Sequence, residues 1–306
     1  MNKLIEQVLS PSFHENADAH APPPWVWSWL GDYAVETLVS SHVHLTLRSG
    51  PEATLVTAVV LRAAQHDAAA FQGLVEGVYQ SLPTVLRQTE QQRIVRMWNH
   101  VPGIGQSMGD DVDRYMVFNA GRYAAMSQWF DGQLAANAPA ASCVGHAGEA
   151  MVVHALATGA GGEPIENPRQ VSAYRYSKRY GPLPPCFARA TRTREPRAAL
   201  LISGTAAITG EESRHLGELQ RQFALTIDHL RTLAGTVAVP IGAASDPLSR
   251  LSHVRAYVPR AADRADIEAW SHEAFCCDVQ ILPADLCRAD LLVEIEAYMH
   301  LEGSNE

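Results

Sequence analysis

The residues best suited to binding a ligand lie near the middle of the chain, where arginines alternate with aromatic residues. Eight of the 24 lysines and arginines fall between residues 169 and 197, against one acid, Glu195, in a chain that is acidic overall. Guanidinium groups bind carboxylates through paired hydrogen bonds, and aromatic rings can wall a flat carbocyclic ligand. The segment therefore predicts a site for a small anion that carries a ring. The alternatives are a solvated loop whose arginines pair with acids and an RNA-binding loop.

The sequence Leu292-Val-Glu-Ile-Glu296 predicts a strand that carries two carboxylates on one face. Successive residues alternate between the two faces of a strand, so Glu294 and Glu296 lie opposite Val293 and Ile295. A carboxyl on a buried face is costly unless it is paired or neutral, and burial raises its pKa toward the range of a general acid. The alternative is an exposed face with two solvated glutamates.

No motif in the chain predicts a metal or a cofactor. The five cysteines include no Cys-x-x-Cys pair, and His42 and His44 have no third ligand nearby in the sequence. Gly103-Ile-Gly105 followed by Gly109 misses the dinucleotide-binding spacing by one residue. We therefore expect a function that needs neither.

Length and charge exclude several broad classes of function. The 306 residues are enough for two modules, and a content of 47% hydrophobic and 19% charged residues is that of a globular protein. A net charge of −9 and a pI of about 5.8 argue against nucleic acid as a partner. No apolar run approaches the ~20 residues that span a bilayer, and Glu6 interrupts the start of any signal peptide. We expect a cytoplasmic protein that binds neither nucleic acid nor membrane.

The apolar pattern predicts two α+β units in tandem. In the first unit, strands are expected at residues 53–61, 93–98 and 151–157, with a helix capped by Asp67 and a second helix near residues 115–130. Ahead of this unit, three consecutive prolines and nearby tryptophans predict an extended arm over about the first 30 residues.

The second unit repeats this order of strands and helices. Its strands are expected at residues 198–208, 252–258, 278–282 and 291–299, with a helix over 216–233 that ends at Gly235 and a shorter helix over 266–275. The Gly- and Pro-rich stretch between the units is long for a connection, which favours a functional role. We divide the chain into an N-terminal arm and first strand (1–50), a first module (51–165), a basic aromatic connecting segment (166–197) and a second module (198–306).

Six ordered motifs resemble those of the chorismatases, a family that includes chorismate hydrolases and 3-hydroxybenzoate synthases. They are Phe118-Asn-Ala-Gly-Arg-Tyr123, Asn167-Pro-Arg-Gln-Val-Ser-Ala-Tyr-Arg-Tyr176, Arg179-Tyr-Gly-Pro182, Phe187-Ala-Arg-Ala-Thr191, Ser203-Gly-Thr-Ala206, and Cys287-Arg288 followed by Val293-Glu-Ile-Glu296. The second module is separately similar to RidA/YjgF-type domains. The resemblance implies an α+β fold of two tandem RidA/YjgF-like (chorismate-mutase-like) modules. Each would be a mixed sheet packed by helices on one face, with the active site in the second module.

The resemblance also implies that chorismate, a cyclohexadiene with two carboxylates, is the small-molecule substrate, and that no cofactor or metal takes part. Glu294 stands at the position of the family's catalytic glutamate, which would protonate the methylene carbon of the enolpyruvyl ether and release pyruvate. Gly204 and Cys287 match the branch that forms 3-hydroxybenzoate, alone or with 4-hydroxybenzoate, and Cys287 would keep a hydrolytic water away. The residues expected to bind the substrate are Arg122, Tyr123, Arg175, Tyr176, Arg179, Tyr180, Arg189, Gly204 and Thr205.

Three other functions remain alternatives. A chorismate hydrolase would give 3,4-dihydroxycyclohexa-1,5-diene carboxylate and pyruvate. A RidA-like imine deaminase would need an arginine in the strand before the final glutamates, where Cys277-Asp-Val-Gln280 offers none. A non-catalytic module would bind an aromatic acid without turning it over.

Overall fold

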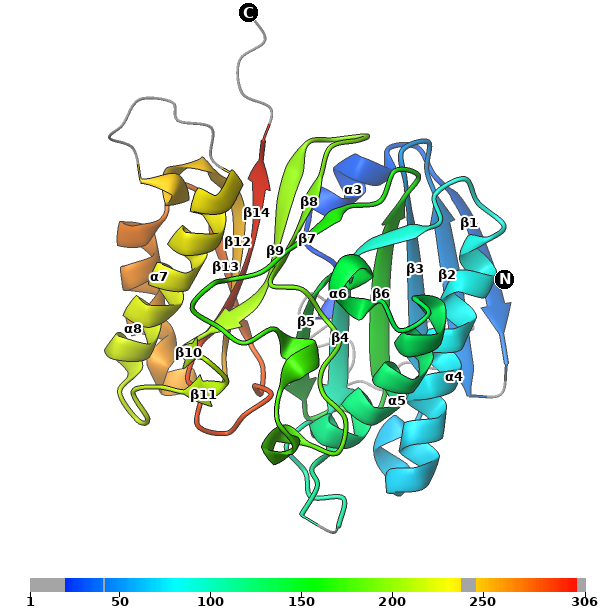
Figure 1. The fold of residues 1–306 in the computed structure, drawn as a ribbon, viewed down its shortest axis with the longest axis horizontal. Helices are drawn as coiled ribbons and strands as arrows, with labels where there is room; N and C mark the ends of the chain where they lie inside the picture. The colour runs from blue at the N-terminus through cyan, green and yellow to red at the C-terminus, as the bar shows by residue number, and fades with distance from the viewer. Residues whose placement is uncertain (1–19, 41, 110, 238–245, 302–306) are drawn as a thin grey trace, which may run out of the picture.

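Two six-stranded mixed sheets, each packed by helices on one face, organise the described part of the protein (Figure 1). The computed structural model describes residues 20–40, 42–109, 111–237 and 246–301. The strand order is β1-β2-β3-β6-β4-β5 in the first sheet and β13-β12-β14-β9-β8-β7 in the second. The expected α+β class with two tandem units is confirmed.

The first sheet is antiparallel except where β4 pairs with β5. Its strands are β1 (Ala34–Val39), β2 (Val43–Ser49), β3 (Ala53–Val60), β4 (Arg93–Pro102), β5 (Ala140–His146) and β6 (Met151–Thr158). The central strand β6 is buried along its whole length, as its run of apolar residues predicts.

Helices α4 (Ala68–Leu86) and α5 (Arg114–Trp129) pack on one face of this sheet. Each begins after an aspartate, Asp67 or Asp113, whose side chain accepts a hydrogen bond from the backbone N–H three residues further on. A short helix, α6 (Leu134–Asn137), leads from α5 into β5.

Gly121 lets α5 lie close to α4. A Cβ added at Gly121 would lie 2.5 Å from the backbone oxygen of Gln72 in α4, so a larger residue would push the two helices apart. This close packing also fixes the position of the next residue of α5, Arg122, relative to α4.

The second sheet is antiparallel except where β12 pairs with β13. Its strands are β7 (Glu163–Ile165), β8 (Ala190–Thr193), β9 (Ala199–Ala206), β12 (Leu251–Val258), β13 (Val279–Pro283) and β14 (Glu294–His300). Helices α7 (Leu219–Val237) and α8 (Arg264–Ala274) pack on one face, and the hairpin of β10 (Ile208–Thr209) and β11 (Glu212–Ser213) follows β9.

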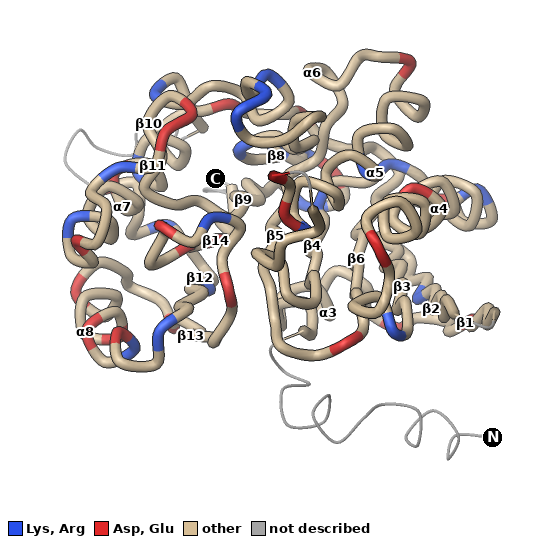
Figure 2. The backbone as a smooth tube through the Cα atoms, turned by 90° about the horizontal axis from the view of Figure 1, so that it is seen from below, with Lys and Arg blue, Asp and Glu red and all other residues tan. Residues whose placement is uncertain are grey.

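The helix-free faces of the two sheets meet each other. Leu55 and Leu156 of the first sheet share one buried cluster with Leu201 and Tyr298 of the second. Figures 1 and 2 both show β9 and β14 next to β5 and β4. Helix α3 (Trp25–Leu30) closes one end of this interface, where Trp25 stacks on Tyr298. Side chains of β4, β5, β9 and β14 that point away from the helices therefore lie between the two modules.

Two expectations about helices are wrong. The segment Trp25–Leu30 is helical and not extended, since Pro24 already has helical backbone angles (φ −55°, ψ −32°) and precedes the first turn. Residues 1–19 of the expected arm lie outside the described residues. Gly235 does not end α7, which continues to Val237, and Leu216 lies before the helix and is 62% exposed.

The sequence pattern also missed β5. Its residues are mostly small (Ala-Ala-Ser-Cys-Val-Gly), so they carry little strand preference, and the strand forms because both of its faces are covered. Small side chains let β5 approach β9, where the Ala141 N–H donates a 2.9 Å hydrogen bond to the Ser203 hydroxyl.

β7, at the end of the predicted first module, and β8, in the predicted connecting segment, both belong to the second sheet. The domain boundaries themselves stay a prediction.

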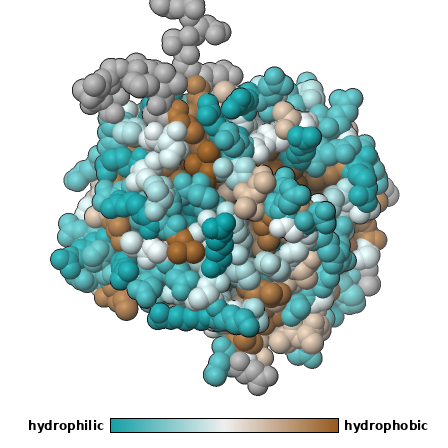
Figure 3. All heavy atoms as spheres, viewed as in Figure 1, coloured by the Kyte–Doolittle hydropathy of each residue, from teal (hydrophilic) through white to brown (hydrophobic). Residues whose placement is uncertain are grey.

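In the described ranges, no helix is both long and apolar enough to cross a bilayer. The face of the molecule in Figure 3 is mainly hydrophilic, with scattered apolar residues.

Candidate active site

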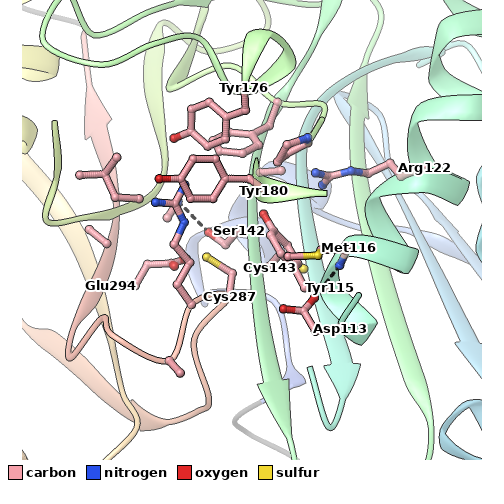
Figure 4. A pocket seen from close by; sticks show the side chains of 18 of the residues that line it. Asp113, Tyr115, Met116, Arg122, Ser142, Cys143, Tyr176, Tyr180, Cys287 and Glu294 are labelled. Carbon is pink, nitrogen blue, oxygen red and sulfur yellow. Dashed lines mark hydrogen bonds between the residues drawn. The ribbon is translucent and has the colours of Figure 1, made fainter. Parts of the chain in front are cut away.

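A pocket of about 400 Å³ lies between the two modules (Figure 4). Its walls come from α5, β5, β9, β14 and the loop before β14, and residues 173–187, which we call the roof segment, cover it. Glu294 and Cys287 line one side, Arg122 lines the opposite side, and Tyr176 and Tyr180 lie above them. The volume is in the range of small-molecule sites, roughly 300–1,000 Å³.

Glu294 lies at the start of β14 with its carboxyl in the pocket and 5% of its surface exposed. Burial raises the pKa of Glu294 to about 8, and the negative charge of Glu296 adds to this rise, whereas Arg96 and Arg189 oppose it. The carboxyl is therefore mainly protonated at neutral pH and is placed to act as an acid.

Glu296 shares the strand face with Glu294, as the alternation predicts, but it is fully paired. Its carboxylate accepts hydrogen bonds from Arg96 (2.8 Å), Trp98 (3.0 Å), Ser142 (2.5 Å) and Tyr257 (3.2 Å). Burial favours the protonated form, but Arg96 and these donors outweigh it and hold the pKa of Glu296 below its usual value. The two glutamates of one strand therefore have opposite protonation states.

Two buried arginines line the pocket, and neither is in direct contact with a carboxylate of the described residues. Arg122 is 1% exposed and Arg189 is 3% exposed. Among the described residues, neither forms an ion pair, and neither Nε has a hydrogen-bond partner. Arg122 donates to Asn119 (2.9 Å), and Arg189 donates to the backbone oxygen of Val171 and to the Tyr176 hydroxyl (both 2.8 Å). Arg189 still interacts electrostatically with the Glu166 and Glu294 carboxyls. Since a buried charge is costly without a counter-charge in direct contact, these two arginines, and Arg122 above all, predict an anionic ligand.

Aromatic rings and a third arginine form the top of the pocket. The Arg288 guanidinium lies 3.8 Å from the ring centre of Tyr180 and 5.4 Å from that of Tyr176. Arg288 also donates to the backbone oxygen of Glu211 (2.8 Å), and the Ser177 hydroxyl donates to the Glu211 carboxylate (2.7 Å). Cation–π contacts and these hydrogen bonds thus hold the roof segment against the second module.

The Cys287 thiol faces the pocket beside Glu294 (Figure 4). Burial raises the pKa of Cys287 to about 12, and the charge of Glu294 adds to the rise. The thiol therefore stays protonated near neutral pH and is a poor nucleophile there. Across the described residues, no group of three or more His, Cys, Asp or Glu side chains is arranged to hold a metal ion.

The structure brings seven of the predicted site residues to one pocket. They are Arg122, Tyr176, Tyr180, Arg189, Gly204, Cys287 and Glu294. Four others lie outside its lining: Tyr123, Arg175, Arg179 and Thr205.

The four outlying residues have other surroundings. The Arg179 side chain is 70% exposed and pairs with Glu212 at 3.6 Å. Arg175 is also exposed, and its guanidinium lies over the Tyr174 ring. Tyr123 packs against the hydrophobic core of the first module, and the Thr205 hydroxyl donates to the Ser203 backbone oxygen (2.9 Å).

The sequence did not single out several lining residues, among them Tyr115, Ser142 and Arg288. Arg288 had a signal, because it directly follows Cys287 in one of the six motifs. Ser142 had none, since it lies on the small-residue strand β5 that the pattern missed.

Gly204 makes room for the Glu294 carboxyl. A Cβ at position 204 would lie 1.9 Å from Glu294 Oε1, so Gly204→Ala is expected to push this carboxyl out of place and lower the rate of any reaction that depends on it, by roughly 10-fold or more. Thr205→Ser, a neighbouring change away from the pocket, should keep the wild-type rate. An equal rate for Gly204→Ala, with a crystal structure showing Glu294 unmoved, would refute this role of the glycine.

The chain is similar in sequence and structure to several known proteins. Residues 28–157 match the family model "Chorismatase FkbO/Hyg5-like, N-terminal". A 3-hydroxybenzoate synthase of Streptomyces hygroscopicus is 36% identical over 232 residues, which cover 71% of this chain and 66% of that protein. A chorismatase of Streptomyces rapamycinicus is 34% identical, covering 66% and 63%. The chain thus spans somewhat less than two thirds of the length of these relatives. A chorismatase crystal structure aligns with a TM-score of 0.73 and 27% identity, covering 87% of this chain and 79% of that one.

Proposed function

The chain belongs to the chorismatase family, and we propose that it converts chorismate to 3-hydroxybenzoate and pyruvate. The observation that carries the proposal is the pair of buried arginines, Arg122 and Arg189, that line one pocket and form no ion pair among the described residues. Chorismate carries two carboxylates on one small ring, so it would supply the two counter-charges that these arginines need.

The remaining walls suit the ring of this substrate. Tyr176 and Tyr180 would cover one face of the cyclohexadiene, and Arg288 would add positive charge at the top of the pocket. Desolvated arginines also hold an anionic substrate in a fixed orientation, which lowers the entropic part of the barrier. Arg175 and Arg179 are not part of this proposal, because their side chains are exposed outside the pocket.

Glu294 would supply the proton that starts the reaction. Its protonated carboxyl would donate to the terminal methylene carbon of the enolpyruvyl ether, so that this carbon becomes a methyl group and the positive charge moves to the ether carbon and oxygen. The C4 hydroxyl oxygen then attacks C3 as the bond from C3 to the ether oxygen breaks, so that pyruvate leaves, the hydroxyl proton is released and an epoxide bridges C3 and C4. Cleavage of the C4–O bond and loss of the C3 proton aromatise the ring with the oxygen on C3, where it takes up a proton, which gives 3-hydroxybenzoate. Loss of the C4 proton without this attack would give 4-hydroxybenzoate instead. Chorismate has the combined atoms of 3-hydroxybenzoate and pyruvate, so this route consumes no water.

Incubation with chorismate tests the proposal. Pyruvate release, followed with lactate dehydrogenase, is expected to match chorismate loss one for one. Chromatography of the aromatic product should show 3-hydroxybenzoate, and a share of 4-hydroxybenzoate would identify a mixed-product enzyme. Pyruvate with only the dihydroxy acid would identify a hydrolase. Chorismate binding without pyruvate release would reject the enzyme and leave a binding module.

The Cys287 side chain is expected to influence which product forms. Cys287→Ala removes a sulfur beside Glu294 and leaves space for a water, so the share of 3,4-dihydroxycyclohexa-1,5-diene carboxylate should rise, by roughly several-fold, over 3-hydroxybenzoate. The measurement is the product ratio by chromatography at equal chorismate conversion. Cys277→Ala, which changes a thiol outside the pocket lining, is the matched control. An unchanged ratio would dismiss the thiol as a determinant of the product.

A further inference from the structure

The two glutamates of β14 differ in their contacts with the first module. The Glu296 carboxylate accepts hydrogen bonds from Arg96 and Trp98 of β4 and from Ser142 of β5, all of them across the module interface. Arg96 is fully buried, and its Nη2 contacts both the Glu296 carboxylate (2.8 Å) and the Ser142 hydroxyl oxygen (2.6 Å). From the second module, Tyr257 donates a hydrogen bond to Glu296, and Arg255 lies 4.0 Å away. Each of these contacts stabilises the ionised form of Glu296.

Among the described residues, Glu294 has no such set of donors. The charged and titratable groups around it are Glu296 on its own strand, Arg96 on β4, Cys143 on β5, Arg189 before β8, Tyr257 opposite it on β12, Cys287 before β14, and Arg122 across the pocket. Among these groups, the nearby negative charge is Glu296, and Arg96 forms its ion pair with Glu296 and not with Glu294.

Two carboxylates so close in a buried site do not both ionise readily, because like charges repel strongly where water is excluded. The one with the better cationic partner ionises first, and its charge then holds the proton on the other. At this site, the better-partnered carboxylate is Glu296, and the partner comes from the first module.

We propose that Arg96 and Glu296 are positioning residues that keep the proton on Glu294: Arg96 holds Glu296 ionised, and the charge of Glu296 keeps Glu294 protonated. The inference rests on the proposed function only in naming Glu294 as the acid. It gives the first module a part in the chemistry of the second, through one ion pair across their interface.

Glu296→Gln is the direct test. Without the charge at position 296, Glu294 should lose its proton at lower pH. The pH at which the rate of pyruvate release falls to half on the alkaline side, the high-pH limb of the profile, should therefore decrease by about one pH unit or more. For a shift of one unit, the rate would then fall by about 2-fold at pH 7 and by close to 10-fold well above pH 8, and lowering the pH would restore it. A merely structural role for Glu296 would lower the rate at every pH. Tyr257→Phe, which removes one hydrogen bond from Glu296 but keeps its charge, should leave the limb in place.

Carbon-13 NMR of the glutamate carboxyls in the ligand-free protein gives the same quantity without turnover. The Glu294 signal, assigned with Glu294→Gln, should titrate near pH 8 in the wild type and lower in Glu296→Gln. If Glu296→Gln does not fold, Arg96→Gln/Glu296→Gln, which leaves neither charge unpaired, should show a smaller shift in the same direction. An unshifted titration in the folded variant overturns the inference. A shifted titration without pyruvate release in the wild type overturns only the proposed function.

Discussion

Glu294→Gln is expected to lower the rate of pyruvate release from chorismate by about 10²–10⁴-fold, the usual contribution of a positioned general acid. Glutamine has the same shape and, like Glu294 at neutral pH, no charge, but its amide cannot give up a proton to carbon. Chorismate binding, measured by calorimetry, should therefore stay within a few-fold of the wild type. The effect belongs to the chemical step and not to assembly of the pocket.

The control for this variant is Glu212→Gln. Glu212 is an exposed carboxylate that pairs with Arg179 outside the pocket lining, so its removal should leave the rate unchanged. Pyruvate release by Glu294→Gln at close to the wild-type rate would remove Glu294 as the acid. Loss of chorismate binding in this variant would instead assign it a role in holding the substrate.

Arg122→Met is expected to weaken chorismate binding by roughly 30- to 5,000-fold, because removing one member of a buried charge pair typically costs about 2–5 kcal/mol. The same change should make the ligand-free protein more stable by about 1–3 kcal/mol, since it removes a buried cation that has no ion-pair partner among the described residues. Calorimetry with chorismate and thermal unfolding without it measure the two effects, which have opposite signs.

Two other arginines provide the controls for this prediction. Arg179→Met should leave chorismate affinity unchanged, because that side chain is exposed. Arg96→Met should destabilise the protein by about 3–5 kcal/mol, because it leaves the Glu296 carboxylate buried and unpaired. If Arg122→Met destabilised the ligand-free protein as strongly as Arg96→Met, the arginine would be structural, and the argument from its missing partner would fail.

The sequence was a good guide where a pattern had one structural solution. Alternation on the last strand placed Glu294 and Glu296 on a common face, and the predicted cap at Asp67 marks where α4 begins. Each of these features depends on residues that are adjacent or nearly adjacent in the chain, so local geometry decides them.

The basic segment shows where sequence reasoning ends. Arg175, Arg179 and Arg189 have the same chemistry and lie within 15 residues of each other, yet only Arg189 turns into the pocket. Short 3₁₀ turns at Ala173–Arg175 and Lys178–Tyr180 direct tyrosines inward and leave these two arginines exposed. A loop has no regular period in its sequence, so the sequence does not specify which of its side chains face the pocket.

The protonation states of the two glutamates were also beyond the sequence. Both have apolar neighbours along the strand, and the difference between them comes from Arg96, which lies 200 residues before Glu296 in the chain. The resemblance to chorismatases singled out Glu294, and the structure adds the physical difference between the two carboxyls: one is paired across the module interface, and the other faces the pocket.

The central claim is that a protonated Glu294 acts on a doubly charged ring compound held by buried arginines. The pH dependence of pyruvate release from chorismate by the wild-type protein tests it most directly. We expect the rate to be high near neutral pH and to fall as the pH rises through about 8, where the Glu294 carboxyl ionises. A rate that increases through this range, or no pyruvate at any pH from a protein that binds chorismate, would contradict it.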